Sequence, residues 1–201
     1  MLHFDRATHH FFDELVAMLL ATAANSFTLN VHRLGKPHLF DASHRIWLQG
    51  MPKITNIEIG FFPLPLVTTL ANNQPPNTLD LLTAPLGTNT VPNPTSVNTL
   101  IGPTERIIAG LFIGYFERLL LTVEQRYGLN NTSWPAVCNF GRVVRNAFAH
   151  GGVVNFTNPK AQPVTWRGCT LSPADNGNQL FYRYLAFAEV VALFTDLDAA
   201  V

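Results

Sequence analysis

The chain has 201 residues, of which 47% are hydrophobic and only 13% are charged. This length fits one domain, and the hydrophobic fraction is ample for a core. Thirteen basic and thirteen acidic residues give no net charge, which argues against broad coating of nucleic acid but leaves room for a local phosphodiester site. Because so few residues are charged, we expect a partner to cover apolar surface, most simply a second copy.

The sequence lacks the motifs that several functional classes require. Cys138 and Cys169 are far apart and form no CxxC motif, so neither a zinc site nor a disulfide framework is predicted. The apolar run from Ile107 to Phe116 is too short for a bilayer, which takes about 20 residues. The N-terminus lacks a signal-peptide pattern, so we expect a cytoplasmic protein with no membrane contact. P-loop, GxGxxG, GxSxG and HExxH motifs are absent. The sequence therefore gives no support for an NTPase, a dinucleotide-binding enzyme, a serine hydrolase or a zinc protease.

The first predicted helix covers residues 5–24, where apolar residues recur at helical spacing. His9 with Asp13, and His10 with Glu14, stand four residues apart on it. We interpret both as surface pairs on one helix rather than as metal ligands.

The segment from about 36 to 102 is rich in proline and predicts no long helix. Two short strands, 45–48 and 54–62, are expected to form a hairpin around Gly50, and residues 78–83 predict one or two helical turns. We interpret the segment as an insertion that either forms an ordered lid or packs on a helical bundle.

The second half predicts a central helix over 104–127 and an amphipathic helix from Ser133 or Pro135 to His150. Strands at 153–156 and 164–171 are expected to form a hairpin, followed by a last helix over 179–197. The sequence therefore predicts one domain, 1–201, with an all-α fold: an antiparallel bundle of four to five helices with a short β-hairpin and a proline-rich insertion. Along the central helix, Gly110 and Gly114 would admit another backbone, although glycine is also simply tolerated there.

The helix that ends at His150 separates an apolar stripe from a polar one. Asn139, Arg142, Asn146 and His150 share the polar side, while Arg145 lies about 100° round from Asn146. Arginine holds an anion, an amide orients it and an imidazole moves protons near neutral pH, so these residue types suit chemistry at a phosphate. The alternative is a solvated helix face whose terminal histidine interacts with the helix dipole.

The run Arg145-Asn146-x-x-x-His150, late on an amphipathic helix, resembles the signature of the HEPN superfamily. The Gly-Gly pair, strand pair and closing helix that follow resemble the small stand-alone members linked to plasmids and defence loci. The order of the elements is similar over about residues 104–197, and three residues match the motif residue by residue: Arg145, Asn146 and His150. Some members carry Tyr two residues after the histidine; Gly152 stands there, so the nucleotidylated toxin subtype does not fit.

The resemblance implies a homodimer in which the motif helices face each other across a cleft. It also implies a metal-independent endoribonuclease of the kind found among toxins and phage-defence effectors, with an antitoxin partner and no cofactor. His150 would act as general acid or base on an RNA 2′-hydroxyl, Arg145 would stabilise the phosphoryl charge and Asn146 would orient the phosphate. Arg142 is a supporting substrate-binding cation, and Asn139 is a weaker candidate for substrate binding.

Two other classes stay open. One is a non-catalytic HEPN-like module that binds a nucleotide, RNA or a protein, which neutral net charge and the sideways Arg145 favour. The other is a helical interaction domain whose motif arose by chance.

Overall fold

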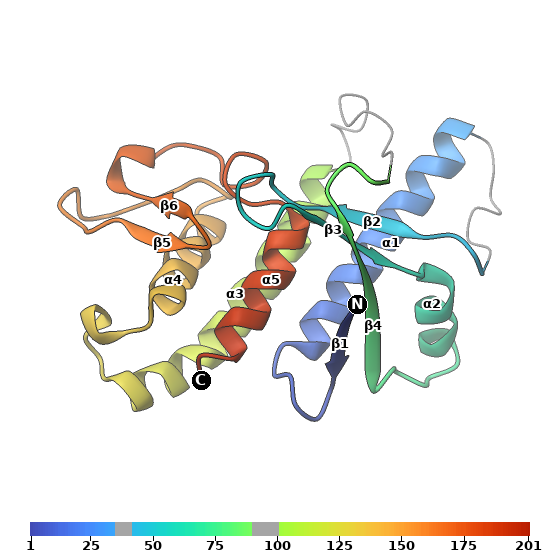
Figure 1. The fold of residues 1–201 in the computed structure, drawn as a ribbon, viewed down its shortest axis with the longest axis horizontal. Coiled ribbons are helices and arrows are strands. Elements are labelled where there is room, and N and C mark those ends of the chain that lie inside the picture. The colour runs from blue at the N-terminus through green and yellow to red at the C-terminus, as the bar shows by residue number, and fades with distance from the viewer. Residues whose placement is uncertain (35–41, 90–100) are drawn as a thin grey trace.

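The computed structural model describes residues 1–34, 42–89 and 101–201, and it has a mixed α/β fold (Figure 1). The described residues form five α-helices, a four-stranded antiparallel sheet and a separate β-hairpin. The all-α prediction was therefore wrong. Its error lies in the N-terminal residues and the proline-rich segment, which supply all four strands of the sheet. Residues 36–41 and 90–100 of the predicted insertion lie outside the described residues.

The sheet has the order β1-β4-β3-β2. Its strands are β1 (Leu2–Asp5), β2 (Ile46–Gln49), β3 (Ile57–Phe61) and β4 (Thr78–Pro85). The hairpin predicted around Gly50 is confirmed, since Ile46 pairs with Phe61 and Gln49 with Glu58. The helical turns predicted at 78–83 are wrong, because these residues are extended in β4 between β1 and β3. Between β3 and β4, Pro63 and Pro65 occupy the first turn of α2 (Pro63–Ala71), where proline fits.

The remaining helices are α1 (Phe12–Leu34), α3 (Ile101–Tyr127), α4 (Ala136–Ala149) and α5 (Phe187–Asp198). Helices α3 and α4 follow the predicted ranges closely. Helix α5 starts later than predicted because the chain between 179 and 186 is irregular. Tyr182 there has φ +63°, which no α-helix accommodates.

The second hairpin consists of β5 (Val164–Trp166) and β6 (Cys169–Leu171). Its turn residues, Arg167 and Gly168, both have positive φ, the geometry that suits a two-residue hairpin. The predicted strand at 153–156 is instead a loop that makes one bridge, Val153 to Gln179. The prediction of a single long strand at 164–171 was also wrong, since both arms of the hairpin fall inside that range.

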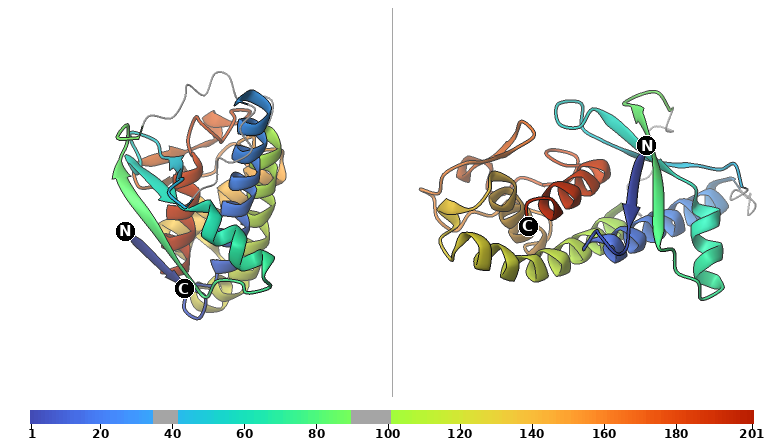
Figure 2. Two further views of the ribbon diagram at one scale, coloured as in Figure 1. Left: turned by 90° about the vertical axis from the view of Figure 1, so that its right-hand side faces the viewer. Right: turned by 60° about the horizontal axis from the view of Figure 1, so that its bottom comes forward.

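Helix α3 connects the two ends of the molecule, because it packs against α1 near the sheet and against α4 near the hairpin (Figure 2). The shared core is aromatic: the rings of Phe11 and Phe194 stack at 5.5 Å, and Phe112 meets Phe148 edge-on at the same separation. Gly141 lets α4 approach closely, since a Cβ there would lie 2.9 Å from the Phe116 ring. Helix α4 is thus held firmly against α3, which fixes the position of its polar side.

Candidate functional site

Helix α4 buries one face, as the sequence predicted, and leaves a half-buried polar ridge that contains Arg145 but not the predicted His150. Its buried residues include Phe140, Val144 and Phe148. The ridge consists of four half-buried side chains: Asn139, Arg142, Arg145 and Asn146. The ridge is therefore close to the surface but tied to a rigid element.

Arg145 reaches sideways across the ridge and contacts two groups. Its Nη1 donates to Asn146 Oδ1 at 3.2 Å, and its Nη2 forms an ion pair with Glu117 on α3. Its Nε is buried and donates to no acceptor among the described residues. The guanidinium is thus oriented but retains donor capacity.

Arg142 is the less satisfied of the two arginines. Its Nε is also buried without an acceptor, and no ion pair to it occurs within the described ranges. Burial lowers the pKa of Arg142, although a guanidinium stays charged at neutral pH. A fixed, incompletely solvated cation of this kind is suited to an anionic ligand, because an unpaired buried donor gains most from an acceptor.

Two clefts flank the ridge, and Arg142, Asn146 and Asn131 line both. The larger, of about 640 Å³, lies between α4, the 3₁₀ turn η2 (Asn131–Ser133) and the loop that precedes β5. The smaller, of about 370 Å³, lies between α4 and α3 and contains Arg145 and Glu117. The structure therefore brings Arg142, Asn146 and Asn139 together in one cleft, and Arg142, Asn146 and Arg145 in the other.

Asn139 has a structural contact as well as a place in the larger cleft. Its Nδ2 donates to the Asn131 carbonyl at 2.8 Å and more weakly to that of Trp134 at 3.3 Å. Its amide nitrogen thus holds η2 against α4, and only its Oδ1 is left to face a ligand.

His150 is not brought together with the other motif residues. It is exposed, follows the last residue of α4, and lines neither cleft. Its backbone N–H closes the helix on the Asn146 and Ala147 carbonyls at 3.1 Å. Gly151 and Gly152, with φ of +75° and +81°, then turn the chain away, as glycines after a helix commonly do. The imidazole has no hydrogen-bond partner in the described part of the chain.

Sequence reasoning missed the polar residues that the loop before β5 contributes to the larger cleft, among them Asn155, Asn158 and Lys160. They lie in an irregular loop, so no periodicity marks them. The only available signal was their polar character directly after the motif helix.

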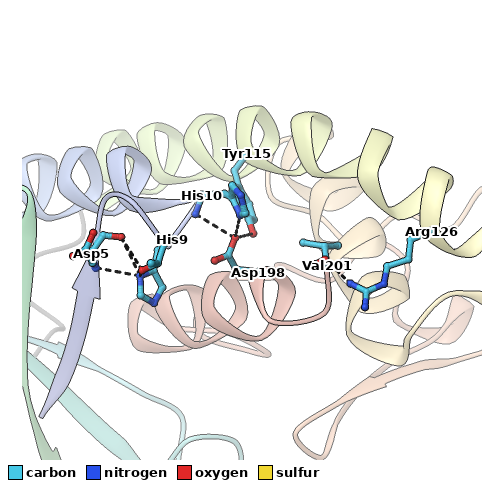
Figure 3. A network of polar contacts seen from close by, with 8 residues as sticks. Asp5, His9, His10, Tyr115, Arg126, Asp198 and Val201 are labelled. Atoms are coloured by element: carbon cyan, nitrogen blue, oxygen red, sulfur yellow. Dashed lines mark hydrogen bonds and ion pairs between the residues drawn. The ribbon is translucent and has the colours of Figure 1, made fainter.

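A second polar cluster joins the two ends of the chain (Figure 3). His10 Nδ1 lies 2.8 Å from Asp198 Oδ1, and the Tyr115 hydroxyl lies 3.5 Å from the same oxygen. Burial, followed by the charge of Asp198, raises the pKa of Tyr115 well above its usual range.

The predicted pairing of His10 with Glu14 was wrong, as Glu14 instead pairs with Arg118. The predicted pairing of His9 with Asp13 was wrong as well, because His9 contacts Asp5 and Asp13 pairs with Arg6.

Comparison with known proteins gives no relative: no family model, curated protein or solved structure matches the chain. Within the described ranges, no group of three or more His, Cys, Asp or Glu residues is placed to hold a metal ion. None of the helices described is both long and apolar enough to cross a membrane. Because no family model or known protein matches, the resemblance to HEPN proteins depends on Arg145, Asn146 and His150 and on the elements around them.

Proposed function

We propose that the chain is a metal-independent endoribonuclease whose active site is composite, formed by two copies of the chain. One observation carries the proposal: two arginines on adjacent turns of α4 each have a buried Nε that finds no acceptor among the described residues, beside an oriented amide. A bridging phosphate would supply the missing acceptors, since guanidinium groups match its oxygens in charge and geometry.

The chemistry requires RNA. The imidazole of His150 takes the proton of a 2′-hydroxyl, and the 2′-oxygen attacks the adjacent phosphorus. The bond between phosphorus and the 5′-oxygen breaks, and the 5′-oxygen takes up the proton from the imidazolium. The products carry a 2′,3′-cyclic phosphate and a 5′-hydroxyl. Arg145 and Arg142 stabilise the charge on the phosphoryl oxygens, and Asn146 orients them. A toxin or phage-defence effector, acting in the cytoplasm and held in check by an antitoxin, would use such a reaction.

A second copy of the chain accounts for the position of His150. Because this imidazole lies outside both clefts of its own chain, it would act on a phosphate held by Arg145 and Asn146 of the other copy. The exposed face of α3 suits such a contact. Ile107 and Leu121 are half or more exposed there, and no atom of the described residues lies within 4 Å of a Cβ built on Gly110 or Gly114. A second backbone could therefore approach this face closely, next to the ion pair of Arg145.

The alternative is a binding module without catalysis. It is favoured by the ion pair that already engages Arg145 with Glu117 and by the separation of His150 from the clefts. In that case the ridge would hold RNA or a nucleotide without cutting it.

Incubating end-labelled RNA with the protein in EDTA separates the two functions. We expect cleavage with 2′,3′-cyclic phosphate ends, no cleavage of DNA of the same sequence, and a loss of about 10²-fold or more in His150→Ala. His3→Ala is the matched control, since His3 is also exposed but lies on β1, paired with Asp80. Intact RNA, or equal cleavage by His150→Ala, would contradict the ribonuclease; RNA bound but left uncut would favour the module.

A further inference from the structure

Among the described residues, those that line the larger cleft beside α4 supply cations and amides but no carboxylate. Its lining includes Arg142 and Lys160 and five asparagines: Asn131, Asn139, Asn146, Asn155 and Asn158. The chain as a whole has as many acidic as basic residues, and the smaller cleft contains two glutamates, Glu117 and Glu124. The larger cleft is therefore a local positive region in a protein of no net charge, which favours an anionic ligand.

The amides of this cleft retain both donors and acceptors for a ligand. Asn155 is half-buried and its side chain makes no hydrogen bond to any described residue. Asn146 uses its Oδ1 for Arg145, and Asn158 uses its Oδ1 for the Lys160 N–H, so the Nδ2 of each has no acceptor within the described part of the chain. Asn139 keeps its Oδ1. An amide offers a donor and an acceptor side by side, which is the pattern that reads the edge of a nucleobase.

The wall opposite α4 is fixed before any ligand binds. Asn176 Oδ1 accepts from the Phe156 N–H at 2.7 Å, and Asn176 Nδ2 donates to the Phe156 carbonyl at 3.0 Å. Val154 is held by two backbone bonds, from its N–H to Asn178 and from Gly177 to its carbonyl. A ligand thus meets a preorganised loop, which reduces the entropy lost on binding.

The size of the cleft and its apolar floor suit a single nucleotide. Its volume of about 640 Å³ lies within the range of small-molecule sites. Val143, Phe156 and Val164 are buried residues that line it, so a flat aromatic base would have an apolar surface to lie against. Unpaired bases of RNA are commonly bound in this way, with amides on the base edge and cations on the phosphate.

We propose that this cleft binds one unpaired ribonucleotide, with Arg142 and Lys160 on the phosphate and Asn155 and Asn158 on the base edge. The proposal deepens the ribonuclease function and rests on it for the choice of RNA as ligand. Arg142 and Asn146 line both clefts. The bound nucleotide would therefore adjoin the phosphate held at Arg145, and the cleft would set which base stands beside the cut.

Calorimetric titration of the full-length chain in EDTA tests the proposal. The probes are the four ribonucleoside 5′-monophosphates, ribose 5-phosphate and inorganic phosphate. We expect at least one nucleotide to bind about tenfold more tightly than ribose 5-phosphate. Asn155→Ala should lower nucleotide affinity about five- to tenfold and leave that of ribose 5-phosphate unchanged, because one or two hydrogen bonds to the base are lost. Lys160→Gln should weaken both probes.

Two matched controls are available outside the cleft lining. Asn77→Ala removes an exposed asparagine beside β4, and Lys53→Gln removes a lysine in the turn between β2 and β3; neither should change binding. The proposal is overturned if no nucleotide binds, if ribose 5-phosphate binds as tightly as every nucleotide, or if Asn155→Ala binds like wild type while folded by circular dichroism.

The same preparations, assayed for RNA cleavage, keep the two proposals apart. Nucleotide binding without cleavage contradicts the ribonuclease and leaves the nucleotide site in place. Cleavage without nucleotide binding in this cleft contradicts the nucleotide site and leaves the ribonuclease in place.

Discussion

The buried Nε of Arg142 donates to no acceptor among the described residues. An unsatisfied buried donor lowers the stability of the folded state, so folding alone does not explain an arginine at this position. Arg142→Met keeps the stem of the side chain and removes the guanidinium. We expect the free energy of unfolding to stay within about 0.5 kcal/mol or to rise by up to about 1 kcal/mol. The affinity for RNA should fall about tenfold, since a charged contact to phosphate is lost. Urea unfolding and RNA titration measure the two effects.

The outcome separates a binding role for Arg142 from a structural one. A variant that loses more than about 1 kcal/mol of stability would show that the guanidinium supports the fold. Unchanged RNA affinity would remove Arg142 from the site. The pattern of unaffected folding with impaired binding is typical of residues placed for function.

At the scale of elements, Asp196 fastens the β5–β6 hairpin to α5. It accepts from Trp166 Nε1 at 2.8 Å and from two nitrogens of Arg167. Burial alone would raise the pKa of Asp196, but these bonds outweigh burial and lower it. The folded state therefore binds the proton less readily than the unfolded state. Its contribution to stability is present above the ordinary aspartate pKa of about 3.9 and is lost as the pH falls through the lower folded-state pKa.

We expect Asp196→Asn to be less stable than wild type by about 1 kcal/mol at pH 7, a modest effect because both partners are partly exposed. The difference should disappear under acidic conditions, where wild type also loses the charge. Unfolding in urea as a function of pH checks this, with Asp80→Asn as a surface control. A difference that stayed constant or grew towards low pH would contradict the clamp.

Some of these elements could be predicted from the spacing of apolar residues in the sequence, and others could not. Helix α4 was predictable because its apolar residues recur at helical spacing over its whole length, and the glycines after it have the positive φ expected of a helix end. Strand β4 was not, since polar and apolar residues alternate over only four residues, Thr78 to Leu81, before Leu82 breaks the alternation, and Leu81 is its one fully buried residue. Residues 180–185 carry buried apolar side chains at helical spacing without being helical, because spacing alone does not specify the backbone.

The site was predictable in part for the same reason. The ridge residues Asn139, Arg142 and Asn146 share a face because α4 is regular, so spacing placed them together correctly. The opposite wall of the larger cleft depends on tertiary bonds from Asn176 to Phe156. Contacts twenty residues apart in an irregular loop leave no periodic trace in the sequence, so Asn155 and Lys160 were missed.

At the scale of the whole molecule, Glu189 joins α5 to the turn between β2 and β3. It is fully buried and accepts from the backbone N–H groups of Met51 at 2.8 Å and Ala186 at 2.9 Å, and from the Thr55 hydroxyl. This carboxylate is therefore a polar contact between the sheet and the helices that carry the site.

Glu189→Ala should lower the free energy of unfolding by about 3 kcal/mol, because three donors lose a charged acceptor inside the core. Glu124→Ala, a half-buried glutamate on α3 without an ion pair among the described residues, should have little effect. Thermal and urea unfolding measure both. Near-wild-type stability of Glu189→Ala would mean that the sheet and the helices hold together without this contact.

The composite site is the central claim, and mixing two inactive variants tests it most directly. Arg145→Ala and His150→Ala should each lose cleavage of RNA in EDTA, while their mixture, after exchange of subunits, should recover about a quarter of wild-type activity. Half of randomly mixed dimers pair the two variants, and each such dimer has one intact site of its two. A mixture that stays as inactive as its components would contradict a site shared between two copies.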